Sequence, residues 1–208
     1  MKVSANVMYL DSPPAQTIPV ILDSLPVPAT FEEREMPRRA RLQIDLILLA
    51  IEALDLSGSE AILTTASELE LQDIIKNRVN LWRLRSANPL RRFSQRRSLS
   101  VVEAKALVVI ASYLARRMTV LIRQLLLAYQ QLSEKQLSME HHFRLSDYLD
   151  RFRKHFRSRM NPRRSGVIAY TSDEKLNDLA ISLLGELLFC TGTAGMQRFW
   201  SSLFDGEI

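Results

Sequence analysis

The alternation of apolar and polar positions is most regular between Ser100 and Glu134. Leucine, valine, isoleucine and alanine fill most of this segment, and its polar residues recur every three, four or seven positions. These polar positions form a narrow stripe: Lys105, Ser112, Arg116, Thr119, Arg123 and Gln130. The spacing predicts a helix, and Ser100 with Glu103 forms an S-x-x-E capping box at its start. Because most of its faces are apolar, we expect a long helix over about 100–134 at the centre of a bundle.

Shorter periodic segments precede this helix. Arg41–Leu54 reads as a mostly buried helix, with Pro37 tolerable in its first turn. Ser59–Leu71 and Leu71–Arg85 read as two shorter helices or as one bent helix, and Asn88-Pro89 ends this run.

Three further helices are predicted in the C-terminal half. The first has one apolar face, formed by Leu145, Tyr148, Leu149, Phe152, Phe156 and Met160, with Arg144, Arg151, Lys154 and Arg157 on its other faces. Asn161-Pro162 ends it, and Thr171 with Glu174 repeats the capping-box pattern before an amphipathic helix that runs to Leu188. Met196–Phe204 supplies a last short helix.

These elements predict an all-α fold, a single helical bundle of about six to seven helices over residues 37–208. Residues 1–36 contain five prolines and no sustained helical period. We therefore expect an extended or disordered, proline-rich tail that contributes little to the core.

Composition agrees with a globular helical protein. Hydrophobic residues make up 47% of the chain and charged residues 25%, which excludes wholesale disorder, and there are only six glycines. The single cysteine, Cys190, cannot form an internal disulfide. The apolar stretches fall short of the ~20 residues that a membrane span needs, and no secretory signal pattern is evident. The sequence thus predicts no transmembrane segment and a cytoplasmic location.

The positive charge is concentrated in two acid-free segments. The formal net charge is +5, but Ile74–Val102 holds eight basic residues without an acid, and Arg151–Ser172 holds seven. The rest of the chain therefore has 13 basic and 23 acidic residues. This segregation suits an anionic partner, and the predominance of arginine suits bidentate contacts with carboxylates or phosphates.

Both basic segments share one arrangement, in which a helix stops at Asn-Pro and an arginine pair follows. The pairs are Arg91-Arg92 and Arg163-Arg164. Arginines that project from loops can engage phosphates, carboxylates or anionic head groups. The alternative is that they neutralise helix C-termini or pair with acidic residues of the body.

No catalytic constellation, cofactor site or metal site is predicted. Thr191–Gly195 resembles an anion-binding glycine turn, but it lacks the preceding strand and the Gly-Lys-Ser/Thr ending of a phosphate loop. We therefore expect Gly192 to end one helix and Thr193 or Gly195 to begin the next. His141, His142 and His155 lack the spacing of metal ligands, and Cys190 is expected to be a buried, inert thiol.

Seven segments resemble a cyanobacterial family of conserved proteins of unknown function, over about residues 41–208. These segments are Gly58–Ala61, Leu71–Val79, Leu81–Arg85, Asn88–Arg92, Asp147–Arg153, Met160–Arg164 and Leu188–Arg198. The resemblance implies a cytoplasmic or thylakoid-associated protein of a photosynthetic bacterium. It implies no substrate and no catalytic residues.

The leading hypothesis is a non-enzymatic helical binding or adaptor protein that docks an acidic protein partner or an anionic membrane surface. The residues expected to bind are Arg83, Arg85, Arg91, Arg92, Arg96, Arg97, Arg151, Arg157, Arg163 and Arg164. One alternative is an RNA- or DNA-binding module that uses the same arginines on phosphates. The other is an enzyme that uses Cys190 or the Thr191–Gly195 turn.

Overall fold

The computed structural model describes residues 22–28, 35–54, 57–77, 99–133, 138–160 and 172–205. Within these ranges the chain forms helices and no strands, which confirms the all-α class. The helices are α2 (Arg38–Leu54), α3 (Ser59–Glu68), α5 (Val101–Arg117), α6 (Thr119–Ser133), α7 (Met139–Met160), α9 (Asp173–Phe189) and α10 (Thr193–Ser202).

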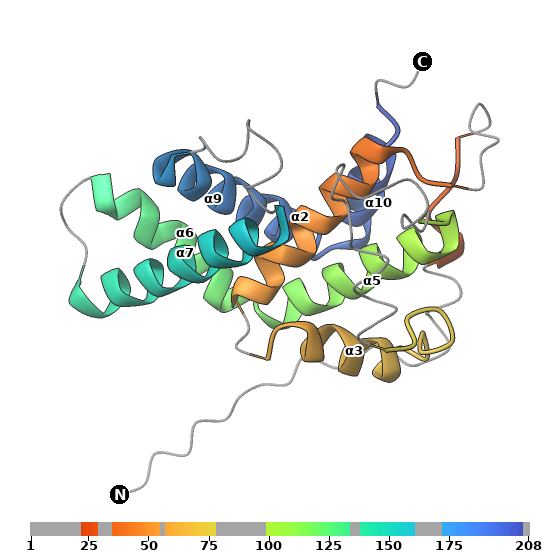
Figure 1. Cartoon of the computed structure of the whole chain (residues 1–208), viewed down its shortest axis with the longest axis horizontal. Coiled ribbons are helices and arrows are strands. Elements are labelled where there is room, and N and C mark those ends of the chain that lie inside the picture. Colours follow the sequence, from red (N-terminus) through yellow and green to blue (C-terminus); the bar gives the residue numbers. More distant parts are fainter. Residues whose placement is uncertain are drawn as a thin grey trace, which may run out of the picture.

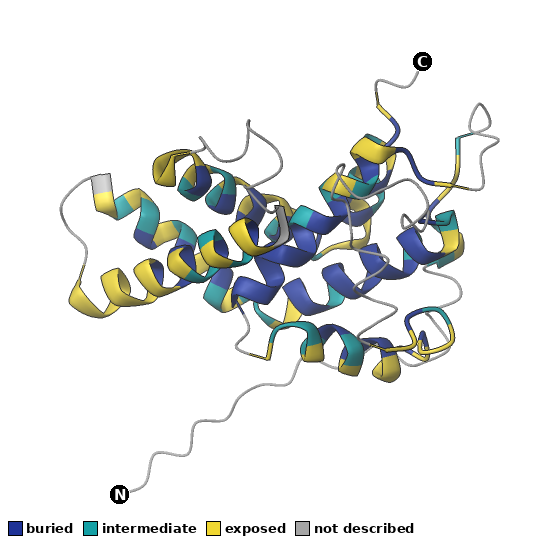
Figure 2. Ribbon diagram, viewed as in Figure 1, coloured by how far each residue is buried: buried dark blue, intermediate teal, exposed yellow. Residues whose placement is uncertain are grey.

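Two helices, α2 and α5, form the centre of the molecule (Figure 1). Helix α2 packs against α5, α7 and α9, while α5 packs against α2, α3, α9 and α10. Four successive residues of α2, Leu48 to Ile51, are fully buried, so the C-terminal half of this helix is enclosed on all sides. Figure 2 shows the buried residues concentrated along these two helices.

The segment predicted as one central helix is divided at Met118. Helix α5 ends at Arg117 and α6 begins at Thr119. The hydroxyl of Thr119 donates hydrogen bonds to the carbonyls of Ala115 (3.2 Å) and Arg116 (2.8 Å), and Met118 has φ −101° and ψ 13°. A threonine hydroxyl that bonds to preceding carbonyls competes with the helix ladder and bends it. The division lets α5 stay in the centre while α6 packs against α7 and α9.

Helix α3 ends in a tight turn. Glu70 has φ 56°, its N–H donates to Ser67 O (3.1 Å), and the N–H of Leu71 donates to Ala66 O (2.7 Å). This pair of bonds is a Schellman motif, in which a residue other than glycine occupies the left-handed position. A single bent helix through residues 59–85 is therefore excluded, and residues 72–75 and 77 form turns and bends. The rest of the helix expected there, 78–85, lies outside the described residues.

The two predicted capping boxes lie within one residue of the observed helix starts, whereas α2 begins three residues before Arg41 and α10 three residues before Met196. Ser100 and Glu103 form the expected capping box at α5, with both reciprocal bonds present. At α9 the N-cap is Ser172, whose hydroxyl accepts from the N–H of Lys175. The sequence pattern predicts Thr171 as the cap instead, because either hydroxyl is able to accept this bond.

Part of the segment predicted as a tail packs on the fold. Leu25 is fully buried and Met36 is 7% exposed, and both belong to the core cluster. The N–H of Met36 donates to Leu99 O at 2.7 Å. Residues 22–28 and 35–36 thus depart from the expected extended tail, while 1–21 and 29–34 lie outside the described residues.

In the described part of the chain, no helix is both long enough and apolar enough to span a bilayer.

Candidate functional site

Two of the ten predicted binding arginines lie within the described residues. Arg151 and Arg157 are on α7. The other eight, Arg83, Arg85, Arg91, Arg92, Arg96, Arg97, Arg163 and Arg164, lie outside the described residues. The geometry therefore bears on the α7 part of the second basic segment.

Two arginines of α7 pair with aspartates of the same helix. Arg151 lies 3.2 Å from Asp147, and Arg153 forms an ion pair with Asp150. Both arginine side chains are mostly buried, at 24% and 19% exposure, whereas the aspartates are more than 60% exposed. The arginine side chains thus lie along the helix surface, and the aspartate carboxylates face solvent.

Arginines of α7 also bond to the first turns of α9. Arg153 donates to the Asn177 side-chain oxygen at 2.7 Å and lies 3.9 Å from the Asp173 carboxylate. Arg157, which is 49% exposed, forms an ion pair with Asp173. Asp173 occupies the first turn of α9, where a carboxylate also favours the positive end of the helix dipole. These contacts join the C-terminal half of α7 to the start of α9.

This ion-pair network lowers the positive charge expected on the surface of the second basic segment. The segment contains no acid in sequence, yet in space three aspartates surround its arginines. A phosphate or lipid head group approaching Arg151 or Arg153 would meet these carboxylates. The described arginines of α7 thus pair with nearby carboxylates. The arginine pairs Arg91-Arg92 and Arg163-Arg164, for which this alternative was considered, lie outside the described residues.

The polar stripe of α5 has a structural role at the end of α9. The hydroxyl of Ser112 donates to the carbonyl of Cys190 at 2.5 Å. Arg116 donates from Nε and from a terminal guanidinium nitrogen to the carbonyl of Thr191, at 3.2 and 3.1 Å. Carbonyls at a helix C-terminus lack partners within the helix and favour cations. The stripe thus caps α9 from a neighbouring helix.

The α9–α10 joint, defined as Cys190–Gly195, is closely packed. Helix α9 ends at Phe189 with Cys190 as its C-cap, so Gly192 does not end it as predicted but is the N-cap of α10. Helix α10 begins at Thr193, one of the two predicted starts. A Cβ added at Gly195 would collide with the carbonyl oxygen of Phe189 and lie 2.8 Å from its carbonyl carbon. Only glycine fits here, because α10 approaches the end of α9 so closely.

Cys190 has the environment of an inert thiol. It is 5% exposed, and burial together with the nearby Glu186 carboxylate raises its pKa to about 12. A thiol with such a pKa is protonated at neutral pH, and the thiolate is the nucleophilic form. This geometry favours the packing role that the sequence suggested.

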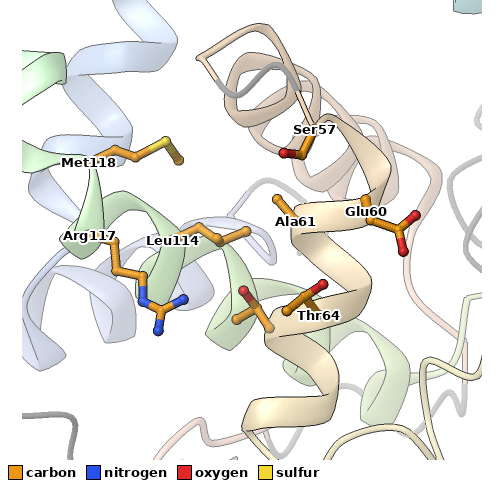
Figure 3. A pocket seen from close by; sticks show the side chains of 8 residues that line it. Ser57, Glu60, Ala61, Thr64, Leu114, Arg117 and Met118 are labelled. Atoms are coloured by element: carbon orange, nitrogen blue, oxygen red, sulfur yellow. The ribbon is translucent and has the colours of Figure 1, made fainter.

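A shallow pocket of about 270 Å³ lies between α3 and the end of α5 (Figure 3). Ala61, Leu114 and Met118 supply apolar lining, and Ser57, Glu60, Thr64, Thr65 and Arg117 supply polar groups. Arg117 is fixed by an ion pair with Glu68 at 2.9 Å and lies 4.8 Å from the Tyr113 ring centroid. The pocket can admit a small apolar side chain. Sequence patterns missed it because it arises from the packing of two helices.

The tip of the α6–α7 hairpin exposes large apolar side chains. Met139 is 71% exposed, Phe143 is 64% exposed and Leu132 is 42% exposed. Residues Ser138–Arg144 are all exposed, and Figure 2 shows this end of α7 standing clear of the buried centre. The sequence contains a signal for this exposure. Met139 and Phe143 are four residues apart and therefore share one face of the helix, but this face is not the buried face that begins at Leu145.

The histidines do not assemble a metal site in the described part of the chain. No group of three His, Cys, Asp or Glu side chains there could hold a metal ion. His141 Nδ1 lies 2.9 Å from the Ser138 hydroxyl at the start of α7, where it takes part in a local helix-start contact.

The chain matches a known protein family over most of its length. Residues 37–205 match the family model described as "Protein of unknown function (DUF3038)". No curated protein matches the chain, and no solved structure matches it.

Proposed function

We propose, for a chain that belongs to the DUF3038 family, a non-enzymatic helical adaptor protein that docks an acidic protein partner through its first arginine-rich segment. The observation that carries this proposal is charge segregation. Eight basic residues and no acid lie between Ile74 and Val102, in a chain whose remainder outside the two basic segments has ten more acids than bases.

The α7 ion pairs support a division of labour between the two basic segments. Arg151, Arg153 and Arg157 already have aspartate partners, so their contribution to a positive surface is reduced. The first segment is the longer of the two acid-free runs and holds eight basic residues. We assign docking to Arg83, Arg85, Arg91, Arg92, Arg96 and Arg97, with Arg163 and Arg164 as further contributors.

Two features favour a protein partner over a polyanion. The aspartates of α7 would repel phosphate oxygens, whereas a protein surface can place basic side chains opposite them. The exposed Met139 and Phe143 add apolar area of the kind that marks protein interaction surfaces. A cyanobacterial origin and a location at the thylakoid surface, which the sequence resemblance implies, are finer parts of the same proposal.

The test compares two variants with equal charge loss. Replacing Arg91, Arg92, Arg163 and Arg164 with glutamine should abolish capture of an acidic protein from native lysate, identified by mass spectrometry. The control replaces Arg123, Arg144, Lys175 and Arg198, which are exposed elsewhere, and should retain capture. Equal loss in both variants would contradict a localised docking surface and leave only a general charge effect.

Parallel assays separate the alternatives. Retention of RNA or DNA in a gel-shift series, with affinity falling steeply as salt rises, would support the nucleic-acid module instead. Sedimentation with anionic but not neutral lipid vesicles would support the membrane surface. A further assay introduces the Cys190→Ala variant into a deletion strain. If the variant folds and captures its partner normally but does not restore function, the result would support the enzyme hypothesis.

A further inference from the structure

The pocket between α3 and the end of α5 is formed by two facing rows of side chains. Helix α5 and its C-cap supply Leu114, Arg117 and Met118, and α3 supplies Ala61 and Thr64 (Figure 3). Ala61 has only a methyl group as its side chain, so it does not fill the space in front of Leu114 as a larger apolar residue would. The two helices therefore pack without closing this pocket of about 270 Å³.

The lining combines an apolar wall with one guanidinium group. Ala61, Leu114 and Met118 form the wall, and Leu114, which is 4% exposed, joins it to the hydrophobic core. Among the described residues that line the pocket, Arg117 is the only cation. Such a lining suits a small ligand with an apolar body and one negatively charged group.

Arg117 is held in position by two neighbours. Its Nη1 lies 2.9 Å from the Glu68 carboxylate, and its guanidinium carbon lies 4.8 Å from the centre of the Tyr113 ring. A guanidinium has five N–H donors, and the Glu68 contact uses only one of its three nitrogens, so donors remain for a ligand. Since the Arg117 side chain is 47% exposed and already oriented, a ligand can reach it at a small cost in side-chain entropy.

The charges around Arg117 favour a monoanion. Glu60 also lines the pocket, and Glu68 contacts the guanidinium. These two carboxylates repel an incoming anion, and because the repulsion grows with the charge of the ligand, they disfavour a phosphate dianion more than a carboxylate. A carboxylate also matches the planar guanidinium in geometry.

We propose that the α3–α5 pocket binds a small aliphatic carboxylate. Arg117 binds the carboxylate group, and the aliphatic body packs on Ala61, Leu114 and Met118. The site involves neither of the two arginine-rich segments, so it goes beyond the docking function proposed above and is tested separately from it. Because the pocket is shallow and the ligand is small, the expected dissociation constant is about 1 mM.

The test titrates isovalerate, a branched aliphatic carboxylate, into the isotope-labelled full chain and follows the amide chemical shifts by two-dimensional NMR. We expect saturable shifts concentrated in residues 57–65 and 113–118. Isovaleramide has the same body without the charge and should bind at least ~10-fold more weakly, because a hydrogen bond to a charged group is lost. Acetate lacks most of the aliphatic body and should bind roughly 5- to 10-fold more weakly.

Two variants separate the charge of the site from its shape. Arg117→Gln should weaken isovalerate binding at least ~10-fold, because it removes the charged donor. Ala61→Leu keeps Arg117 but fills the space in front of Leu114, so it should abolish binding. The control Arg123→Gln removes the same charge from an exposed position on α6 and should bind isovalerate as the wild type does.

Several results would overturn the proposal. If isovalerate produces no saturable shift at concentrations up to about 20 mM, the pocket binds no small carboxylate. Equal affinity for isovalerate and its amide would show that charge is not recognised, and equal affinity for isovalerate and acetate would show that the apolar wall is not used. Displacement of isovalerate by a lower concentration of inorganic phosphate would contradict the preference for a monoanion. Binding that persists in both Arg117→Gln and Ala61→Leu would place the ligand elsewhere on the protein.

Discussion

Helices α5 and α7 both carry arginines among apolar residues, but the two sets have different partners. On α5, Arg116 and Ser112 bond to the carbonyls of Thr191 and Cys190, which are main-chain groups at the end of α9. On α7, Arg153 and Arg157 pair with carboxylates that are more than half exposed. A main-chain carbonyl at a helix end is fixed by the fold, whereas an exposed carboxylate can exchange its partner with little loss. The Ser112 contact of α5 therefore belongs to the core, whereas Arg116 is exposed although it bonds to the main chain, and the α7 pairs end on exposed carboxylates.

The largest expected change in stability is at the α9–α10 joint, to which the α5 contacts bind. Gly195→Ala should lower the free energy of unfolding by about 3 kcal/mol or more, because the new methyl group would collide with the Phe189 carbonyl. Gly185→Ala, in the middle of α9 with nothing within 4 Å of the added carbon, should be neutral or stabilising by up to ~1 kcal/mol. Urea denaturation of both variants gives the comparison, and equal values would show that the joint is loosely packed.

A smaller effect is expected from the hydroxyl that caps α9. Ser112→Ala should cost about 1–3 kcal/mol, because Ser112 is 8% exposed and its loss removes a bond to the buried Cys190 carbonyl. Thermal unfolding followed by circular dichroism measures the loss. An unchanged midpoint would mean that the α5 stripe is dispensable, and the contrast with α7 would disappear.

The α7 ion pairs should contribute less to the free energy of unfolding than the Ser112 hydrogen bond does. Arg153→Gln should cost about 1–2 kcal/mol, because its 19%-exposed guanidinium bonds to both Asp150 and Asn177. The neighbouring exposed Lys154→Gln should change stability by less than ~0.5 kcal/mol. High salt should reduce the difference in the free energy of unfolding between the Arg153 variant and the wild type, since salt screens exposed ion pairs. A salt-independent loss above 3 kcal/mol would place Arg153 with the core contacts of α5.

Local sequence signals predicted the helices well and their tertiary partners poorly. The capping box of Ser100 and Glu103 was confirmed because both residues act within one turn. The bend at Met118 was missed, since Thr119 is compatible with either a straight helix or a bent one until its hydroxyl bonds to preceding carbonyls. The sequence left the end of α3 open between a break at Leu71 and one bent helix, because Glu70 occupies a backbone conformation that usually indicates glycine.

The candidate site shows the same limit. Counting acids along the chain identified an acid-free segment after Arg151, but Asp173 comes from another helix and Asp147 and Asp150 precede the segment by a few residues. Proline content marked residues 1–36 as a tail, while the burial of Leu25 depends on α10, more than 170 residues away. Linear patterns do not contain such contacts.

The most direct test of the central claim compares two sets of arginine-to-glutamine changes by partner capture and by thermal unfolding in the same preparations. The first set is Arg91, Arg92, Arg96 and Arg97, and the second is Arg151, Arg153 and Arg157. We expect the first set to lose capture of the acidic protein with an unchanged midpoint of unfolding. The second set should keep capture and unfold at a lower temperature, because its arginines join α7 to α9. The reverse result, with capture lost only in the second set and stability lost only in the first, would contradict the assignment of docking to the first segment.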